Sequence, residues 1–158
     1  MIEATFIASG KTMQEALNFT ASLVNKIMFE DESFRQVRKI DIFCNNIDDA
    51  NLLDNILWEK PKYSIISHSL VNNSSDDLIE IGYPGTKFNL EANSLINLSP
   101  DLPKNLDCYE NYFQLVVMDG SDLRERAAKT WTECKKLGIK ASFICLLYTS
   151  DAADECLS

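Results

Sequence analysis

Residues 113–144 read FQLVVMDGSDLRERAAKTWTECKKLGIKASFI, and this stretch decides the fold class. Its opening run, FQLVVM, is apolar and rich in β-formers, which is typical of a central strand covered on both faces. Residues 119–122 (DGSD) break the strand and supply caps for a helix over 123–137. Gly138 stops that helix where left-handed backbone geometry is needed, and 139–144 form a last strand. A strand, a helix and a second strand in this order favour an α/β sheet.

Strand and helix patterns also alternate through the rest of the chain. We expect strands over 3–8 and 39–44, followed by short strands over 64–67, 78–83 and 94–98. A helix from Thr12 to Phe29, with Thr12 and Glu15 as a capping box, lies between the first two strands. A second helix, capped by Asp48 or Asp49 and ended by Pro61, follows the strand over 39–44. The chain has 158 residues, which is the size of one ordinary domain. The order of elements therefore predicts a single-domain α/β sandwich over 1–144, with a mixed, largely parallel sheet flanked by helices.

The last residues differ in character from the rest of the chain. Residues 145–155 read CLLYTSDAADE, which resembles a sequencing adapter translated in frame. Segments of that origin do not belong to the fold. We therefore expect 145–158 to be a non-native tail and the natural C-terminus to be missing.

Composition and charge disfavour several classes of protein. The net charge of −9 repels phosphate backbones, so direct, non-specific nucleic-acid binding is disfavoured. No apolar run approaches the roughly 18–20 residues of a membrane span, and the N-terminus does not resemble a signal peptide, so we expect a cytoplasmic protein. Five scattered cysteines without a CxxC motif predict reduced thiols and no bound metal.

The sequence signals no catalytic motif. Gly10-Lys11-Thr12 lies between the first strand and the first helix, but a phosphate-binding loop also needs a glycine five residues before Gly10, where the chain has Thr5. His68 is the single histidine, and no nucleophile or acid is signalled beside it, so we interpret it as structural. We therefore expect no cofactor and no catalytic residue, and a binding module is the leading hypothesis. The alternative is a small enzyme on a nucleotide-binding-like α/β fold, which needs a concave site at the C-terminal ends of the strands.

Basic residues concentrate near the C-terminal helix. Between 122 and 140 the chain has six Lys or Arg and three Asp or Glu, a local charge of +3. With Trp131 and Phe143 nearby as apolar surface, this helix suits an acidic peptide that ends in an aromatic residue better than it suits a duplex. The alternative is a solvated helix face whose arginines pair with acids of the body.

A second feature is the segment 57–70, LWEKPKYSIISHSL. Trp58 ends a helix beside the proline turn at Pro61. Aromatic residues in such rigid settings are enriched at protein–protein contacts, but a tryptophan in the core is as common. Both interpretations of Trp58 stay open.

Taken in order, several segments carry a family resemblance. They are Ala4-Thr5-Phe6, Cys44, Ala50, Leu52-Leu53-Asp54, Leu57-Trp58, Pro61, Ser64-Ile65, His68-Ser69-Leu70, 79–84 (IEIGYP), 95–99 (LINLS), Asp119-Gly120 and the helix end Lys135-Lys136-Leu137-Gly138. Together they resemble the chi subunit of bacterial DNA polymerase III, over essentially all of 1–144.

The resemblance implies a non-catalytic accessory subunit of the replicative DNA polymerase III holoenzyme, associated with the clamp loader. It also implies a nucleotide-binding-like fold that lacks the nucleotide site. Members of the family bind the acidic C-terminal tail of single-stranded-DNA-binding protein through the basic C-terminal helix, and bind the psi subunit or a competing helicase at a second surface, so that they reach DNA only indirectly. By position, the tail-binding residues are Arg124, Lys129, Trp131, Lys135 and Lys136. The residues of the second surface are Trp58, Pro61 and Ile65, where Ile65 replaces the family's usual phenylalanine.

Overall fold

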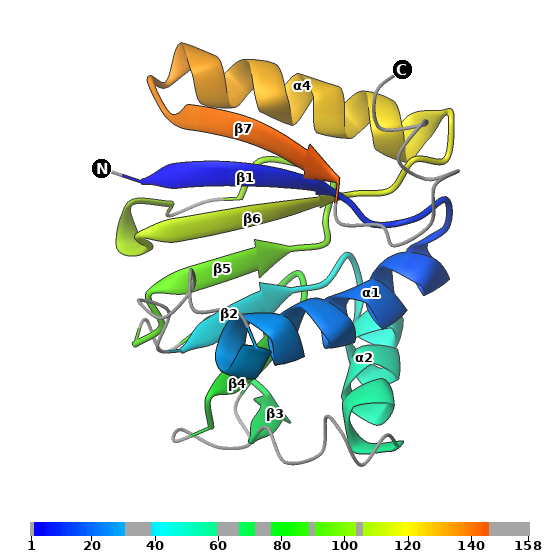
Figure 1. The fold of residues 1–158 in the computed structure, drawn as a ribbon. Helices are drawn as coiled ribbons and strands as arrows, with labels where there is room; N and C mark the ends of the chain where they lie inside the picture. The colour runs from blue at the N-terminus through cyan, green and yellow to red at the C-terminus, as the bar shows by residue number, and fades with distance from the viewer. Residues whose placement is uncertain are drawn as a thin grey trace.

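Figure 1 shows the fold of the chain in a computed structural model. The structure describes residues 2–30, 39–59, 67–71, 77–88, 91–103 and 106–145. In chain order the elements are β1 (Glu3–Ala8), α1 (Met13–Asn25) with a π-helical extension η1 (Lys26–Glu30), β2 (Ile40–Phe43), α2 (Ile47–Glu59), β3 (His68–Leu70), β4 (Ile79–Gly82), β5 (Ser94–Asn97), a 3-10 turn η3 (Leu106–Cys108), β6 (Asn111–Val116), α4 (Asp122–Lys136) and β7 (Lys140–Cys145). The expected alternation of strands and helices is confirmed.

The seven strands of the described residues belong to one sheet, in the order β3-β4-β2-β5-β6-β1-β7. Every pairing between the described strands is parallel, so the α/β class with a largely parallel sheet is confirmed, without the antiparallel member that a mixed sheet would contain. β1 lies between β6 and β7 and pairs with both. The helix α4, which connects β6 to β7, therefore crosses one face of these strands and packs on residues of β1 and β6.

β6 is a central strand, as its composition predicts. Its side chains alternate between the two faces of the sheet. Phe113 and Leu115 enter the core under α1 and α2, whereas Tyr112 and Val116 enter the core under α4. The strand begins at Asn111, earlier than the apolar run alone suggests, because Tyr112 is fully buried as well.

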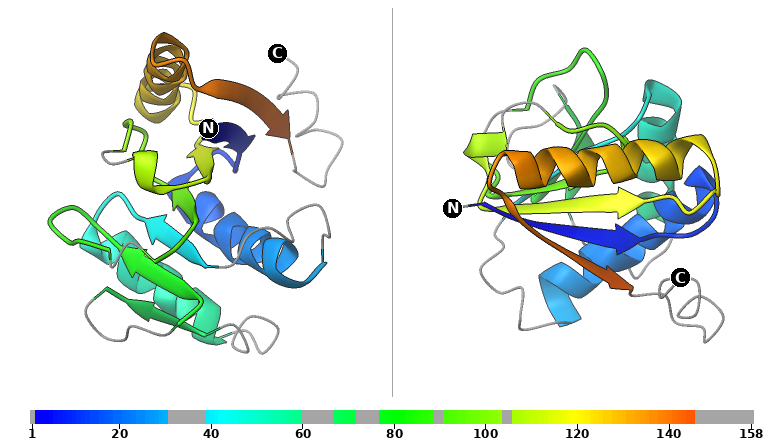
Figure 2. Two further views of the ribbon diagram at one scale, coloured as in Figure 1. Left: turned by 90° about the vertical axis from the view of Figure 1, so that its left-hand side faces the viewer. Right: turned by 90° about the horizontal axis from the view of Figure 1, so that it is seen from above.

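Two apolar cores lie on the two faces of the sheet. α1 and α2 cover one face, where Leu17, Val24 and Leu53 pack against strand residues. α4 covers part of the other face, where Ala127 and Cys134 pack with residues of β1, β5 and β6. Figure 2 shows α1 and α4 on opposite sides of the sheet. Each face of the sandwich therefore presents an outer helix surface to solvent.

Of the two helix N-caps that the sequence predicts in the first half of the chain, one is confirmed and one is wrong. The Oγ1 atom of Thr12 accepts a hydrogen bond from the backbone N–H of Glu15 at 3.1 Å, as the capping box predicts. α2 is capped instead by Asn46, whose Oδ1 accepts from the N–H of Asp49 at 2.8 Å. Asp48 and Asp49 lie in the first turn, so the predicted aspartate cap is wrong. Their carboxylates still favour the start of the helix through its dipole.

Two expectations fall partly outside the described residues. Ser67, the last residue of the strand expected over 64–67, is not part of a strand, and 64–66 lie outside the described ranges. The third strand is β3, where His68 and Leu70 pair with Ile79 and Ile81 of β4. Cys145, the first residue of the expected tail, ends β7, and 146–158 lie outside the described ranges. The boundary between domain and tail stays a prediction.

Candidate functional site

α4 carries the predicted basic surface and begins with a strong cap. The carboxylate of Asp119 accepts hydrogen bonds from the backbone N–H groups of Ser121 at 2.9 Å, Leu123 at 3.2 Å and Arg124 at 3.2 Å. These bonds hold the pKa of the Asp119 carboxyl below its usual value, and the bond from the backbone N–H of Ser121 has the largest effect. Gly138, at a φ of +77°, follows the helix at the residue that the sequence predicts.

An ion pair and a hydrogen bond fix one side of α4 against the loop that follows β5, and a second ion pair lies within the helix. Thr130 Oγ1 donates to the carbonyl oxygen of Pro100 at 2.6 Å. Arg126 pairs with Asp101 at 2.5 Å and with Asp122 at 3.3 Å. The interpretation that arginines of this helix pair with acids of the body is therefore correct for Arg126, which positions the helix.

The other basic side chains of α4 face solvent. Arg124, Lys129, Lys135 and Lys136 are exposed, and none of them forms an ion pair within the part of the chain that the structure describes. The Nζ atom of Lys135 lies 4.9 Å from the centroid of the Trp131 ring, a cation–π contact. Helical spacing aligns Arg124, Trp131 and Lys135 in one stripe, whereas Lys129 and Lys136 lie roughly 120–140° around the helix from Arg124. The structure thus brings Trp131 and Lys135 together and places the other three cations on the same helix.

Trp131 is half-buried and held by an aromatic contact. Its ring meets that of Phe6 edge to face, with centroids 5.0 Å apart and ring planes at 80°. Phe6 is in register with Phe143 of the edge strand β7, and Phe143 is 40% exposed. The apolar surface expected near the basic helix is therefore present, and it is anchored in the core under α4.

Trp58 lies on the surface, so its interpretation as a core residue is wrong. It sits in the last turn of α2 with 56% of its area exposed. Its ring contacts that of His68 on β3, with centroids 4.4 Å apart and planes at 47°. Nε2 of the buried His68 lies 3.6 Å from Oδ1 of Asp54, which is one helical turn before Trp58. His68 therefore has the structural part expected of it, as a support for Trp58, whereas Pro61 and Ile65 lie outside the described residues.

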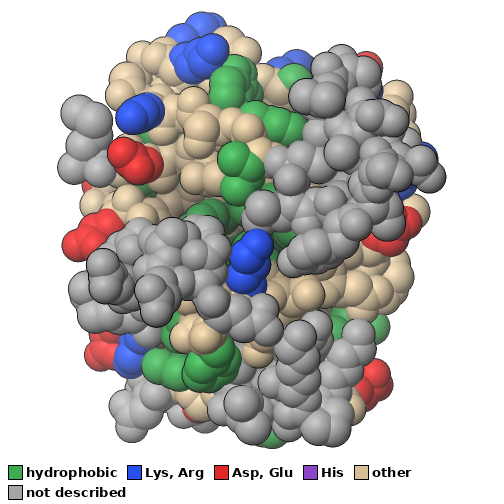
Figure 3. All heavy atoms as spheres, viewed as in Figure 1, with side chains coloured by type: hydrophobic (Ala, Val, Ile, Leu, Met, Phe, Trp, Pro, Cys, Tyr) green, Lys and Arg blue, Asp and Glu red, His purple; other side chains and the backbone are tan. Residues whose placement is uncertain are grey.

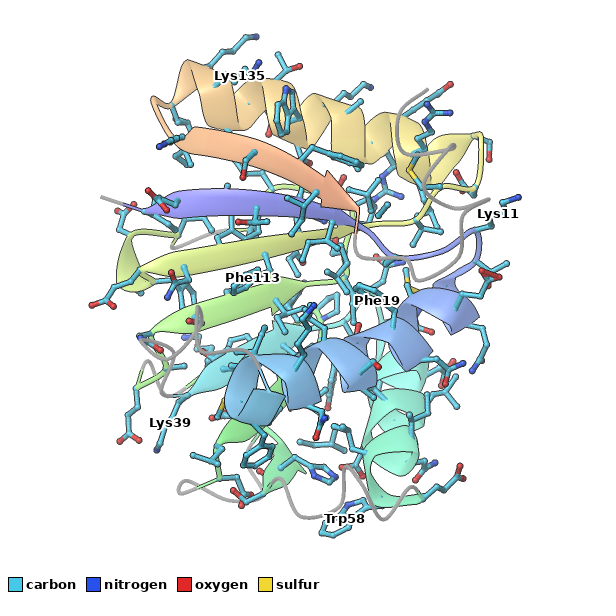
Figure 4. The ribbon with its side chains drawn as sticks, in the orientation of Figure 1. Lys11, Phe19, Lys39, Trp58, Phe113 and Lys135 are labelled. Carbon is cyan, nitrogen blue, oxygen red and sulfur yellow. The ribbon has the colours of Figure 1, made fainter. Side chains whose placement is uncertain are left out.

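The two surfaces lie at opposite ends of the molecule. Figure 4 shows Lys135 at one end, on α4, and Trp58 at the other, at the end of α2. Figure 3 shows Lys and Arg side chains at the end where α4 lies. This separation leaves room for two partners on one molecule.

The N-terminus of α1 is occupied by one of the protein's own carboxylates. Oε1 of Glu15 accepts a hydrogen bond from the backbone N–H of Lys11 at 3.1 Å. A Cβ added to Gly10 would lie 2.6 Å from the Cβ of Glu15, so this side chain packs directly on the glycine. Helix N-termini attract phosphate through such N–H groups. A phosphate at this position would have to displace Glu15, which agrees with the incomplete phosphate-loop pattern.

A cavity of about 740 Å³ lies near the C-terminal ends of β2, β4 and β5. Its walls include the aromatic rings of Phe43, Phe88 and Tyr109. Its carboxylate, Asp101, is already paired with Arg126. Within the described ranges, no three His, Cys, Asp or Glu side chains are grouped so as to hold a metal ion. The cavity has the location that the enzyme alternative needs, but its acid is engaged in holding α4.

A buried acid that the sequence did not signal ties the η3 segment to the sheet. Asp41 on β2 is 1% exposed, and its Oδ2 accepts a hydrogen bond from the hydroxyl of Tyr109 at 2.7 Å. Burial is the largest effect on the pKa of Asp41 and raises it to about 7. The negative charge of Glu80, in register on β4, also raises this pKa, whereas the hydrogen bond from Tyr109 and the positive charge of Lys39 lower it. Because Asp41 and Tyr109 are 68 residues apart, no local pattern reveals the pair.

Comparison with known proteins supports the resemblance. The model of the family described as DNA polymerase III chi subunit, HolC, matches residues 1–142. A search of curated proteins finds no match to the chain. In the part of the chain that the structure describes, no helix has the length and apolar character needed to cross a bilayer. Since the family model spans all but the last few described residues, the chain belongs to the DNA polymerase III chi subunit (HolC) family and is an accessory component of the replicative polymerase.

Proposed function

We propose that this chain is a non-catalytic, clamp-loader-associated subunit that links DNA polymerase III to single-stranded-DNA-binding protein in the bacterial cytoplasm. Membership of the chi family makes it a replication accessory subunit. The observation that carries the finer proposal is the exposed basic surface of α4, with Lys135 over Trp131, on a protein whose net charge is −9.

The chemistry of α4 fits the acidic, Phe-ending tail that the family resemblance implies. The exposed cations of the helix attract carboxylates over a distance and bind them on contact. Trp131, with Phe143 on the neighbouring edge strand, offers apolar surface to the terminal aromatic ring. Because Phe6 already holds Trp131 in place, little side-chain entropy is lost when a peptide binds there.

The second surface, around Trp58, is proposed to bind the psi subunit or a competing helicase. Exposed tryptophans held by a rigid neighbour are typical anchors of protein interfaces, and His68 is such a neighbour. The resemblance adds Pro61 and Ile65 to this surface. DNA is reached only through the partners, because the whole-molecule charge repels phosphate.

The alternative of a small enzyme has less support. The position at which a nucleotide phosphate would bind holds the side chain of Glu15, and the acid of the cavity near β5 is paired with Arg126. Both features favour a nucleotide-binding-like fold without the nucleotide site.

Titration of the full chain with a synthetic acidic peptide ending in Phe tests the proposal. We expect an affinity that falls with added salt and that drops about tenfold or more when Lys135→Glu and Lys136→Glu are combined. Lys87→Glu, which reverses an exposed cation on the loop after β4, is the control and should leave binding unchanged. Binding indifferent to salt and to reversal would contradict the electrostatic mechanism. No binding by the folded chain would contradict the assignment.

A further inference from the structure

The outer face of α2 combines exposed apolar side chains with negative charge. Ile47, Leu52 and Trp58 are 50%, 36% and 56% exposed. They are half of the six large hydrophobic side chains that are exposed within the described residues, and all three lie on this one helix. The helix, IDDANLLDNILWE, carries four carboxylates and neither Lys nor Arg. Such a patch is typical of a surface that binds another protein.

Helical spacing places Ile47 and Trp58 on one surface. α2 turns its buried apolar residues toward α1 and the sheet, so the opposite side faces outward. Ile47 and Trp58 are about three turns apart and align in a stripe roughly 16 Å long. Leu52 and Glu59 are about two turns apart and align roughly 120° around the helix from that stripe, beyond Asn51 and Asn55. The surface is long enough to receive about three turns of a partner helix.

The carboxylates of α2 surround the apolar stripe. Asp48 and Glu59 are exposed, and Asp54 lies next to Trp58, where it approaches His68. No Lys or Arg of the described residues forms an ion pair with any of them. The next cations along the chain follow Glu59 directly and lie outside the described ranges. The described face therefore offers negative charge that a partner can neutralise.

We propose that the outer face of α2 binds a basic amphipathic helix of a partner protein. The apolar side chains of that helix would cover Ile47 and Trp58, and its Lys or Arg side chains would lie beside Asp48 and Glu59. The inference rests on the Trp58 surface of the proposed function and adds the chemistry of the partner. The proposal rests on charge complementarity. The exposed carboxylates of α2 attract a basic partner, whereas the exposed cations of α4 attract an acidic one.

Two synthetic helical peptides test the inference against the full chain by calorimetry. They share one apolar pattern and carry either Lys or Glu at the polar positions. We expect the Lys peptide to bind about tenfold tighter than the Glu peptide at low salt, and the difference to shrink as salt is added.

Charge variants of the protein locate the contact. Glu59→Lys should weaken binding of the Lys peptide about threefold to tenfold without loss of fold, because a Lys near a helix C-terminus suits the dipole. Asp107→Lys makes the same change of charge on the exposed surface of η3 and is the matched control. It should leave binding unchanged.

Alanine variants of α2 test the contribution of the apolar stripe separately from that of the charged side chains. Trp58→Ala should weaken the Lys peptide about tenfold or more, whereas Asn55→Ala, on the same outer face, should not. Equal binding of the two peptides, or an equal effect of Glu59→Lys and Asp107→Lys, would overturn the basic partner. No binding of either peptide would also overturn it. The titration of α4 with the acidic tail does not involve α2, so it decides the proposed tail-binding function separately.

Discussion

Replacing Asp41 with asparagine should make the protein more stable at neutral pH. The asparagine would keep the size of the side chain and an oxygen that can accept the hydrogen bond from Tyr109. The replacement would remove the ionisable group, whose pKa burial raises from the ordinary 3.8 to about 7. The new amide N–H groups would have an acceptor on the same face of the sheet in Glu80, which is in register on β4.

The magnitude follows from the difference in proton affinity between the folded and unfolded chains. The unfolded chain releases the proton of Asp41 near pH 3.8, and the folded chain holds it to about pH 7. The folded state therefore binds more protons between these values, so the free energy of unfolding falls as pH rises through this window. At about 1.4 kcal/mol for each tenfold difference in affinity, ionised Asp41 costs up to about 4 kcal/mol above pH 7. Between pH 5 and pH 8 the wild type should lose about 2–3 kcal/mol relative to Asp41→Asn.

Urea unfolding followed by circular dichroism at pH 5, 6, 7 and 8 measures this difference. All other titrating groups are common to both proteins, so the difference between the two pH profiles reports Asp41 together with its coupling to Glu80 and Tyr109. Tyr109→Phe is a useful companion, because it removes the hydrogen bond that lowers the pKa of Asp41 and should extend the loss of stability to higher pH. Parallel pH profiles for the wild type and Asp41→Asn would refute the reasoning, as would an Asp41→Asn protein that is the less stable one at pH 8.

Two further predictions concern Trp58 and the end of the chain. Trp58→Ala should weaken binding to psi or its helicase counterpart, spare the acidic tail, and cost about 1–2 kcal/mol of unfolding free energy, because more than half of the side chain is already exposed and its contact with His68 is lost. The neighbouring Leu57→Ala, at a fully buried position, should cost about 2–5 kcal/mol, and equal losses in urea melts would mean that Trp58 is packed in the core. Deleting 146–158, the part of the expected foreign tail 145–158 that follows β7, should leave Tm unchanged in circular dichroism melts. A loss of several degrees would show that these residues pack and are native.

The elements with strong local patterns could be predicted from the sequence. The apolar run of β6, the capping box of Thr12 and Glu15, and the stop at Gly138 each depend on a few consecutive residues. The position of β3 was harder to predict from the sequence, because its three residues form a strand only where His68 and Leu70 can pair with β4. Strand order is also non-local, and no local pattern indicates that β1 lies between β6 and β7.

The candidate site was predictable in its residue types but not in its contacts. Charge counting identified α4, yet it could not separate Arg126, which is tied to Asp101, from the exposed cations of the same helix. The ring of His68 under Trp58 brings together residues of a helix and a strand, and that contact explains how a tryptophan can be exposed and fixed at once. Physical contacts of this kind depend on tertiary packing, which the spacing of residues along the chain does not encode.

Opposite signs on the two surfaces would keep their partners apart. An acidic tail that approached α2 would meet four carboxylates, and a basic helix that approached α4 would meet the exposed cations near Trp131. Each surface therefore disfavours the ligand of the other by repulsion, which is how charged interfaces exclude wrong partners. Because Trp58 and Lys135 lie at opposite ends of the molecule, both ligands can bind together, and the acidic body between them discourages direct capture of DNA. In the proposed function, a subunit built in this way would connect two proteins while it stays off the nucleic acid that they handle.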